Sequence, residues 1–134
     1  MAFAPQMGPA YEHGIRPALE DCGFVAPFRV DDIEHDTQVN EAHFKQRIDD
    51  RIMAEIHRAG LVIVDVTLAR PAVYFEAGFA QGLGTRIIWT CKEDSHADMC
   101  FDTRRTGHIL WTDPADLRTK LTNRVRAYGW HPKP

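Results

Sequence analysis

The heptapeptide Leu61-Val62-Ile63-Val64-Asp65-Val66-Thr67 decides the fold class of this chain. Up to Asp65 its side chains are aliphatic and mostly β-branched, without alternation of apolar and polar residues. Such a continuous run is typical of a parallel strand that is buried on both faces. Because parallel strands are joined by crossover connections, usually helices, we expect helices before and after this run.

Both flanks of this strand have helical patterns. Upstream, residues 41–59 form the clearest predicted helix, which ends at Gly60. Its apolar stripe consists of Phe44, Ile48, Ile52 and Ile56. Downstream, residues 72–83 predict a helix rich in small side chains that ends at Gly84, and residues 86–91 predict a second buried strand.

The N-terminal part of the chain predicts a helix and a strand. The helix covers residues 10–22 and ends at Gly23, a typical residue after a helix C-terminus. Pro17 lies inside this segment, so we expect an irregular first turn or a later start. Residues 24–30 predict a short strand at a sheet edge, because Pro27 lacks one backbone donor.

The C-terminal part predicts a strand followed by a helix. The strand covers residues 108–112, and Asp113 then predicts an N-cap with Pro114 at the first helical position. The apolar stripe of this last helix consists of Leu117, Leu121 and Val125.

Strands that alternate with helices of this length predict a parallel sheet with right-handed crossovers. We therefore expect one α/β domain over residues 1–134, a three-layer sandwich with a mostly parallel sheet of about four to five strands. The first strand of such folds is usually central. Only Met1-Ala2-Phe3-Ala4 precedes Pro5, so we expect a first strand that is very short or truncated.

Composition and charge limit the class of partner. The chain has 134 residues and a mass of 15.3 kDa, with a formal net charge of -3 and an isoelectric point near 6.1. This charge argues against binding of nucleic acid, and no apolar run reaches the roughly 18 residues of a membrane span. The chain has no signal-peptide pattern, and its three cysteines are widely spaced. We expect a cytoplasmic protein that contacts neither nucleic acid nor membranes.

Candidate functional residues gather after the central predicted strand. Open parallel sheets bind ligands beyond the carboxyl ends of their strands, where Asp65 closes the apolar run. Glu76 follows in the first turns of the next helix, near the positive end of the helix dipole, which favours a carboxylate. Gly78, Gly82 and Gly84 each cost a helix about 1 kcal/mol relative to alanine. They indicate close packing on the sheet or close approach of a ligand.

Two other predicted strand-end loops carry charged residues. Arg29 and Asp31 follow the second predicted strand and would contact a ligand or simply solvate the edge. Asp102 precedes Arg104 and Arg105, and two adjacent arginines could hold a phosphate group by bidentate contacts. The alternative is a solvated pair of charges.

The order of these segments resembles a known family. The run ending in Asp65-Val66-Thr67 is followed by Val73-Tyr74-Phe75-Glu76-Ala77-Gly78-Phe79-Ala80-Gln81-Gly82-Leu83-Gly84 and by Ile87-Ile88-Trp89-Thr90-Cys91. This order is similar to the nucleoside 2-deoxyribosyltransferase-like family, which is related in architecture to TIR-like domains. Phe101-Asp102-Thr103-Arg104 and His108-Ile109-Leu110-Trp111 resemble the C-terminal part of that family.

The resemblance covers most of the chain from residue 3 to residue 126. It implies a flavodoxin-like sheet and an enzyme that cleaves or transfers the N-glycosidic bond of a nucleoside or nucleotide. The nucleophilic glutamate of the family matches Glu76, and its strand-end aspartate matches Asp65. A carboxylate below the sugar stabilises positive charge on the ring or attacks C1′. Asp65 or Tyr74 would give the departing base a proton or a hydrogen bond.

We expect the substrate-binding residues to be Phe3, Arg29, Asp31, Gly78, Asp102, Arg104 and Arg105. The two arginines would suit a 5′-phosphate, which would make nucleotides the substrates. The reaction requires no cofactor.

Two alternatives stay open. A TIR-like enzyme would use the glutamate to split the glycosidic bond of NAD and release nicotinamide. A catalytically silent module would bind nucleotides without turnover. Ala72, which stands where many relatives have Asn or Asp, and the short first strand favour the silent module.

Two further patterns concern metals and partners. Cys91, His96 and Cys100, with Asp94 and Asp98 between them, match no usual zinc spacing, so we expect no metal. We expect a homodimer or a larger homo-oligomer, because aromatic residues are enriched at interfaces. The candidate interface residues are Phe75, Tyr128 and Trp130.

Overall fold

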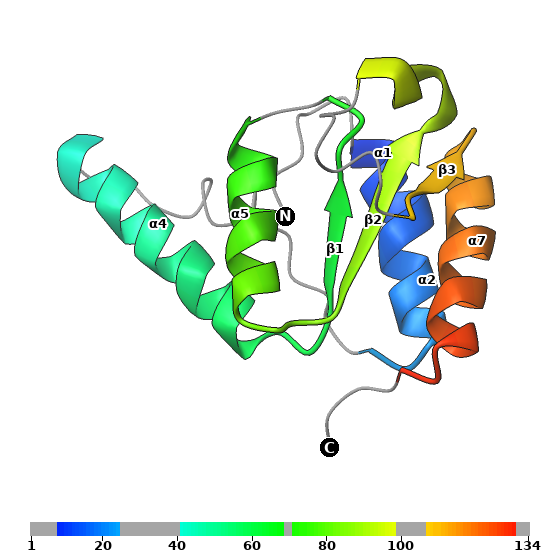
Figure 1. Cartoon of the computed structure of the whole chain (residues 1–134), viewed down its shortest axis with the longest axis horizontal. Helices are drawn as coiled ribbons and strands as arrows, with labels where there is room; N and C mark the ends of the chain where they lie inside the picture. The colour runs from blue at the N-terminus through cyan, green and yellow to red at the C-terminus, as the bar shows by residue number, and fades with distance from the viewer. Residues whose placement is uncertain (1–7, 25–40, 69–70, 99–106, 131–134) are drawn as a thin grey trace.

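The computed structural model describes residues 8–24, 41–68, 71–98 and 107–130, with the backbone alone for 41–49 and 96–98. Within these ranges three strands form one parallel sheet in the order β1-β2-β3 (Figure 1). The strands are β1 (Val62–Asp65), β2 (Ile87–Lys92) and β3 (Ile109–Trp111). The prediction of an α/β fold with a parallel sheet is confirmed. The strands predicted at 1–4 and 24–30 lie outside the described residues, except for Phe24.

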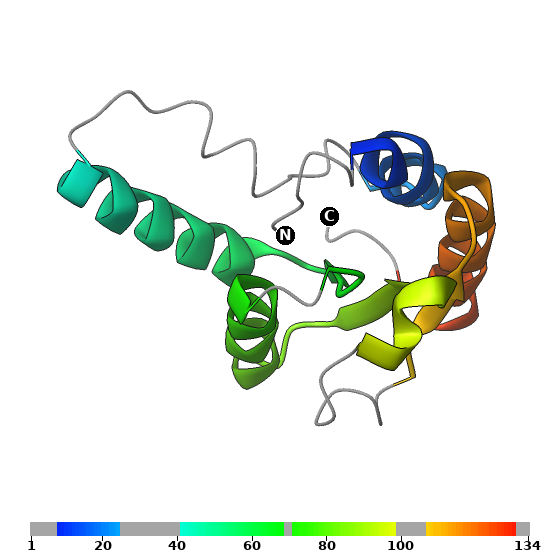
Figure 2. The ribbon, with the colours of Figure 1, turned by 90° about the horizontal axis from the view of Figure 1, so that it is seen from above.

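Helices lie on both sides of this sheet. Figures 1 and 2 show α4 (Glu41–Arg58) and α5 (Pro71–Gly82) on one side. The other side holds α7 (Pro114–Ala127) and the N-terminal helical segment. That segment runs without interruption through α1 (Gly8–Ala10), η2 (Tyr11–Ile15) and α2 (Arg16–Asp21).

Alternate residues of each strand belong to two different cores. Val64 on β1 and Trp89 on β2 pair in register and pack with the buried side of α5. Ile63 and Ile88, the preceding register pair, pack with the buried stripe of α7. The stripe residues are Leu117, Leu121 and Val125, each 0% exposed. The apolar run before Asp65 is therefore buried on both faces, as its composition predicts.

Two predicted helix ends are confirmed by their backbone hydrogen bonds. Gly23 has a φ of 90°, its N–H bonds to the Glu20 carbonyl, and the Phe24 N–H reaches the Leu19 carbonyl at 2.9 Å. Gly84 has a φ of 74° and ends α5 with the same pattern of bonds. Both are Schellman motifs, in which glycine adopts the left-handed conformation without steric cost.

The irregularity predicted at Pro17 takes a specific form. The five residues before Arg16 form a π-helix, η2, and Pro17 follows as the second residue of α2. Because proline has no N–H and its ring conflicts with the carbonyl of an α-helical turn before it, the departure from α-helical pairing lies in that turn. Gly14 lies within η2, and a Cβ there would be 3.0 Å from the Pro114 carbonyl oxygen and from a Leu117 methyl group. The π-helix therefore packs very closely against α7.

The start of α7 is the predicted one. The Asp113 side chain accepts a hydrogen bond from the Asp116 N–H at 2.8 Å, and Pro114 occupies the first turn. This N-cap places Thr112 directly after the carboxyl end of β3, beside the site described next.

Candidate functional site

The Asp65 carboxylate joins the carboxyl ends of three strands. It is 6% exposed and accepts three hydrogen bonds. The hydroxyl of Thr90 on β2 donates to Oδ2 at 2.6 Å, and the indole Nε1 of Trp111 on β3 donates to the same oxygen at 3.0 Å. The backbone N–H of Thr67 donates to Oδ1 at 2.9 Å. One side chain therefore holds the whole edge where parallel sheets bind ligands.

A second side chain extends this network. The Thr67 hydroxyl oxygen accepts the backbone N–H of Lys92 at 2.9 Å. The Val66 N–H donates to the Thr90 carbonyl at 2.9 Å. These bonds continue the pairing of β1 with β2 past Asp65 and order the first residues of the loop that leads to α5.

Asp65 acts as a hydrogen-bond acceptor at both of its carboxylate oxygens. All three described partners of Asp65 are donors. Asp65 is therefore placed to accept hydrogen bonds and to order the strand ends, and of the two predicted proton donors Tyr74 fits that role better.

Glu76 and Tyr74 come from α5, the helix that follows β1. Glu76 is the sixth residue of α5 and partly buried, and the first turn of the helix contains no acidic residue. Because the helix dipole acts mainly on the first turn, it stabilises the Glu76 carboxylate less than the sequence suggests. The Tyr74 ring is partly buried, and its centroid lies 6.5 Å from that of Trp89. Trp89 in turn lies 5.5 Å from His108.

The surroundings of the glycines in α5 differ from the predicted close packing on the sheet. Gly78 and Gly82 are exposed, and a Cβ at either position would meet no described atom within 4 Å. Close packing on the sheet therefore does not explain them, and that interpretation was wrong for the described residues. Phe75, on the same outer side of α5, is 66% exposed. Approach of a ligand or of another chain remains the reason that fits.

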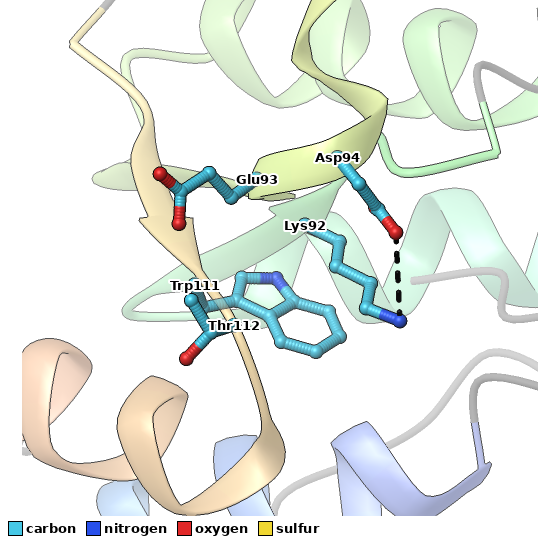
Figure 3. Close-up of a pocket in the computed structure, with 5 residues that line it drawn as sticks. All are labelled: Lys92, Glu93, Asp94, Trp111 and Thr112. Atoms are coloured by element: carbon cyan, nitrogen blue, oxygen red, sulfur yellow. Dashed lines mark ion pairs between the residues drawn. The ribbon is translucent and has the colours of Figure 1, made fainter.

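A cavity opens at the carboxyl ends of β2 and β3. Its volume is about 320 Å³, and its lining includes Trp111 and Thr112 from the end of β3 (Figure 3). The other lining residues are Lys92, Glu93 and Asp94, at the end of β2 and the start of η3 (Glu93–Asp98). The sequence argument placed a ligand at this edge but did not select Lys92, Glu93 or Thr112. Their position directly after two apolar strands was the available signal.

Charges around this cavity are partly paired. The Lys92 ammonium lies 3.9 Å from an Asp94 carboxylate oxygen. On the other side, the N–H and hydroxyl of Thr112 contact the Asp116 carboxylate at 3.0 and 3.3 Å. The backbone hydrogen bond from Thr112 and the side-chain bond from Lys120 lower the pKa of Asp116. Asp116 therefore remains an acceptor that orients the Thr112 hydroxyl.

Several predicted site residues lie outside the described part of the chain. These are Phe3, Arg29, Asp31, Asp102, Arg104 and Arg105. The stretch from Cys91 to Cys100, which was weighed as a metal site, is also only partly described. Within the described residues no group of three or more potential metal ligands comes together. Cys91 is fully buried, and its thiol lies 3.4 Å from the Lys92 carbonyl oxygen.

The candidate interface residues differ in their surroundings. The Tyr128 ring is 53% exposed, and its centroid lies 4.8 Å from that of the Trp130 ring, which is tilted by 49° to it. The Arg124 guanidinium lies 5.8 Å from the Tyr128 centroid. Arg86 lies 5.5 Å from the Trp130 ring. Phe75 has no such ring contact within the described residues.

Comparisons of the chain with protein-family models, with curated proteins and with solved structures found no match. Among the described helices, none combines the length and apolar character needed to cross a membrane.

Proposed function

We propose that this protein cleaves or transfers the N-glycosidic bond of a nucleoside or nucleotide, with Glu76 as the nucleophile. The observation that carries the proposal is the strand edge organised by Asp65. This buried carboxylate ties together β1, β2 and β3 immediately before α5, the helix with Tyr74 and Glu76. An ordered edge of this kind supports a site in which a carboxylate is held against a sugar, as glycosidic cleavage requires.

The proposed reaction has two steps. A Glu76 carboxylate oxygen attacks C1′ of the sugar, and the C1′–N bond breaks with its electron pair going to the base. The Tyr74 hydroxyl donates a hydrogen bond or its proton to the departing base. Water, or a second base in a transferase, then displaces Glu76 from C1′ and restores the free carboxylate. The proton that the water or the second base loses returns to the Tyr74 oxygen, where Tyr74 gave up its own.

The resemblance also supports a fuller architecture. We expect the sheet to have about four to five strands in a flavodoxin-like, three-layer arrangement. The strand from residues 1–4 would be central and next to β1, and the strand from residues 24–30 would lie on its other side. The order β1-β2-β3 of the described strands is compatible with the second half of such a sheet. The exposed Phe75 beside Gly78 and Gly82 supports the expected homodimer or larger homo-oligomer.

Base release is the test of this function. Wild-type protein is incubated with ribonucleosides, deoxynucleosides, their monophosphates and NAD, and free bases are quantified by chromatography. We expect release from at least one nucleoside or nucleotide, and a fall of about 1,000-fold or more in Glu76→Gln. Glu12→Gln, an exposed carboxylate on η2, is the matched control and should retain full activity.

The other outcomes assign the alternatives. Release of nicotinamide from NAD, lost in Glu76→Gln, would identify a TIR-like enzyme instead. Thermal stabilisation by a nucleotide with no product would identify a binding module without turnover. Release that is equal in Glu76→Gln and in the wild type would refute the assigned nucleophile.

A further inference from the structure

Two aromatic rings and two guanidinium groups follow one another in space after the end of α7. The Arg86 guanidinium lies 5.5 Å from the centre of the Trp130 ring, and that ring lies 4.8 Å from the ring of Tyr128. The Arg124 guanidinium lies 5.8 Å from the centre of the Tyr128 ring. These four side chains, Arg86, Trp130, Tyr128 and Arg124, form one arginine–aromatic cluster.

Backbone hydrogen bonds place the cluster at the amino-terminal end of the strands. Arg86 directly precedes β2, and its carbonyl oxygen accepts the N–H of Val62, the first residue of β1, at 2.8 Å. Trp130 follows α7 in a Schellman motif, in which Gly129 has a φ of 65°. Figure 1 shows the red end of α7 at the same end of the molecule as the starts of β1 and β2. The cluster therefore lies at the opposite end of the strands from Asp65.

The two arginines of the cluster differ from most other described cations. Ion pairs with carboxylates hold the side chains of Arg16, Arg58, Lys92, Arg118 and Lys120. Among the residues that the structure describes, neither Arg86 nor Arg124 has a carboxylate partner, and Arg124 donates only to the Gly107 carbonyl, at 3.3 Å. The formal net charge of the whole chain is -3. Two guanidiniums without carboxylates in an acidic chain indicate a surface that meets an anionic group.

The aromatic rings restrict the motion of these two guanidiniums. Trp130 is partly buried and packs against the core on the α7 side of the sheet, whereas Tyr128 is 53% exposed. A guanidinium is attracted to an aromatic ring and still keeps N–H groups that can bind an anion. Arginines that are already ordered lose less conformational entropy when they bind. The cluster is therefore better prepared to bind an anion than isolated surface arginines are.

We propose that the arginine–aromatic cluster docks a short, extended, acidic segment of a partner protein, with carboxylates of that segment on Arg86 and Arg124. Guanidinium and carboxylate groups match in geometry and form paired hydrogen bonds. Arginine, tyrosine and tryptophan are also the residues that contribute most binding energy at protein interfaces. The successive separations of 5.5, 4.8 and 5.8 Å are spanned by a few extended residues, at about 3.4 Å per residue.

Single-stranded nucleic acid fits this surface less well. Its bases bind by stacking on open aromatic faces. Each ring of the cluster already contacts the other ring and one guanidinium, so less of its faces is open to a base. A chain with a net charge of -3 also repels a phosphate backbone. A protein segment at this end of the sheet leaves the Asp65 edge accessible, so the proposal is independent of the proposed function.

A fluorescein-labelled peptide of eight glutamates is the probe, and a labelled peptide of eight glutamines is its uncharged counterpart. Binding of each peptide to the full chain is measured by fluorescence anisotropy at low and at physiological ionic strength. We expect the glutamate peptide to bind at least about tenfold more tightly than the glutamine peptide, and its affinity to fall as salt screens the charges.

Variants with matched charge locate the binding surface. The double variant Arg86→Gln/Arg124→Gln should weaken binding of the glutamate peptide by about tenfold or more. Arg16→Gln/Arg58→Gln removes the same charge from two ion-paired arginines elsewhere, and its affinity should stay within about twofold of the wild type. Tyr128→Ser removes no charge but takes away the ring beside Arg124, so we expect binding to weaken by about threefold.

The contrary results are as specific. Equal affinity for the two peptides, binding of neither, or equal weakening by the two double variants would overturn the proposal. Unchanged binding in Tyr128→Ser would show that charge alone suffices and would overturn the role of the rings. An oligothymidylate of eight nucleotides that binds more tightly than the glutamate peptide, and loses affinity in Arg86→Gln/Arg124→Gln, would assign the cluster to nucleic acid and would also overturn the proposal.

Discussion

At the residue scale, Asp65 shows how one buried acid can organise a sheet edge. A buried carboxylate is costly unless donors surround it. Here Thr90 and Trp111 come from two other strands, 25 and 46 residues away in the chain. The hydrogen-bond donors offset the free-energy cost of desolvating the Asp65 carboxylate. The carboxylate in turn fixes the positions of β2 and β3. The network therefore couples local stability to the geometry of the candidate site.

Removal of one hydrogen-bond donor to Asp65 should lower the free energy of unfolding measurably. Thr90→Val keeps the shape of the side chain, which is 0% exposed, but leaves Asp65 Oδ2 with one donor fewer. We expect a loss of about 1–3 kcal/mol in the free energy of unfolding, measured by urea titration. Thr119→Val is the control, because its exposed hydroxyl only contacts the Ala115 carbonyl within α7. Equal changes in both variants would show that the Asp65 bond contributes nothing special.

At the element scale, two glycines in helical segments have opposite surroundings. Gly14 faces the Pro114 carbonyl and Leu117 at 3.0 Å, whereas Gly78 faces open space. Composition could not separate them, because both look like costly residues in a predicted helix. The difference depends on which helix face meets a neighbour, and for Gly14 that neighbour is about 100 residues away in sequence.

This contrast predicts stability changes of opposite sign. Gly14→Ala should lower the unfolding free energy by about 1–3 kcal/mol, since overpacking against backbone outweighs the gain in helix propensity. Gly78→Ala should raise it by about 0.5–1 kcal/mol, because the methyl group meets no described atom. Thermal unfolding of both variants tests the pair. If Gly78→Ala is stable yet loses base release, the glycine serves approach of the substrate, as the sequence predicts.

The elements themselves were largely predictable from local patterns. The apolar run before Asp65, the glycines at the ends of α2 and α5, and the Asp113 N-cap depend on neighbouring residues only. The hydrogen bond from Trp111 to Asp65 and the cavity beside it were not predictable from local patterns, because they arise from the register of three strands. The site was therefore predicted as an edge of the sheet, and Asp65 is the predicted residue that the structure places there. The roles of Glu76 and Tyr74 stay predictions.

At the scale of the whole molecule, the exposed aromatic residues Tyr128 and Phe75 differ in their contacts within the chain. The ring of Tyr128 packs at a tilt against Trp130 and lies near Arg124, so part of its apolar surface is covered by its own chain. Phe75 is 66% exposed on α5, a helix whose described outer side also holds Gly78 and Gly82. Twelve residues of α5 include only two with polar side chains apart from Tyr74, namely Glu76 and Gln81. A helix apolar on nearly all sides is typically covered on nearly all sides.

This difference predicts which position controls self-association. If the proposed homo-oligomer forms through α5, Phe75→Ser should weaken it by at least about tenfold in dissociation constant, because a large exposed aromatic group is lost from the interface. Tyr128→Ser should leave the constant within about twofold, although it removes a ring that is also more than half exposed. Sedimentation velocity over a range of concentrations measures both variants beside the wild type. A change in the dissociation constant caused by Tyr128→Ser alone would place the interface at the Tyr128–Trp130 pair. A wild-type chain that is monomeric at all concentrations would contradict the expected homo-oligomer, and the exposed face of α5 would then be available to a ligand or to a different protein.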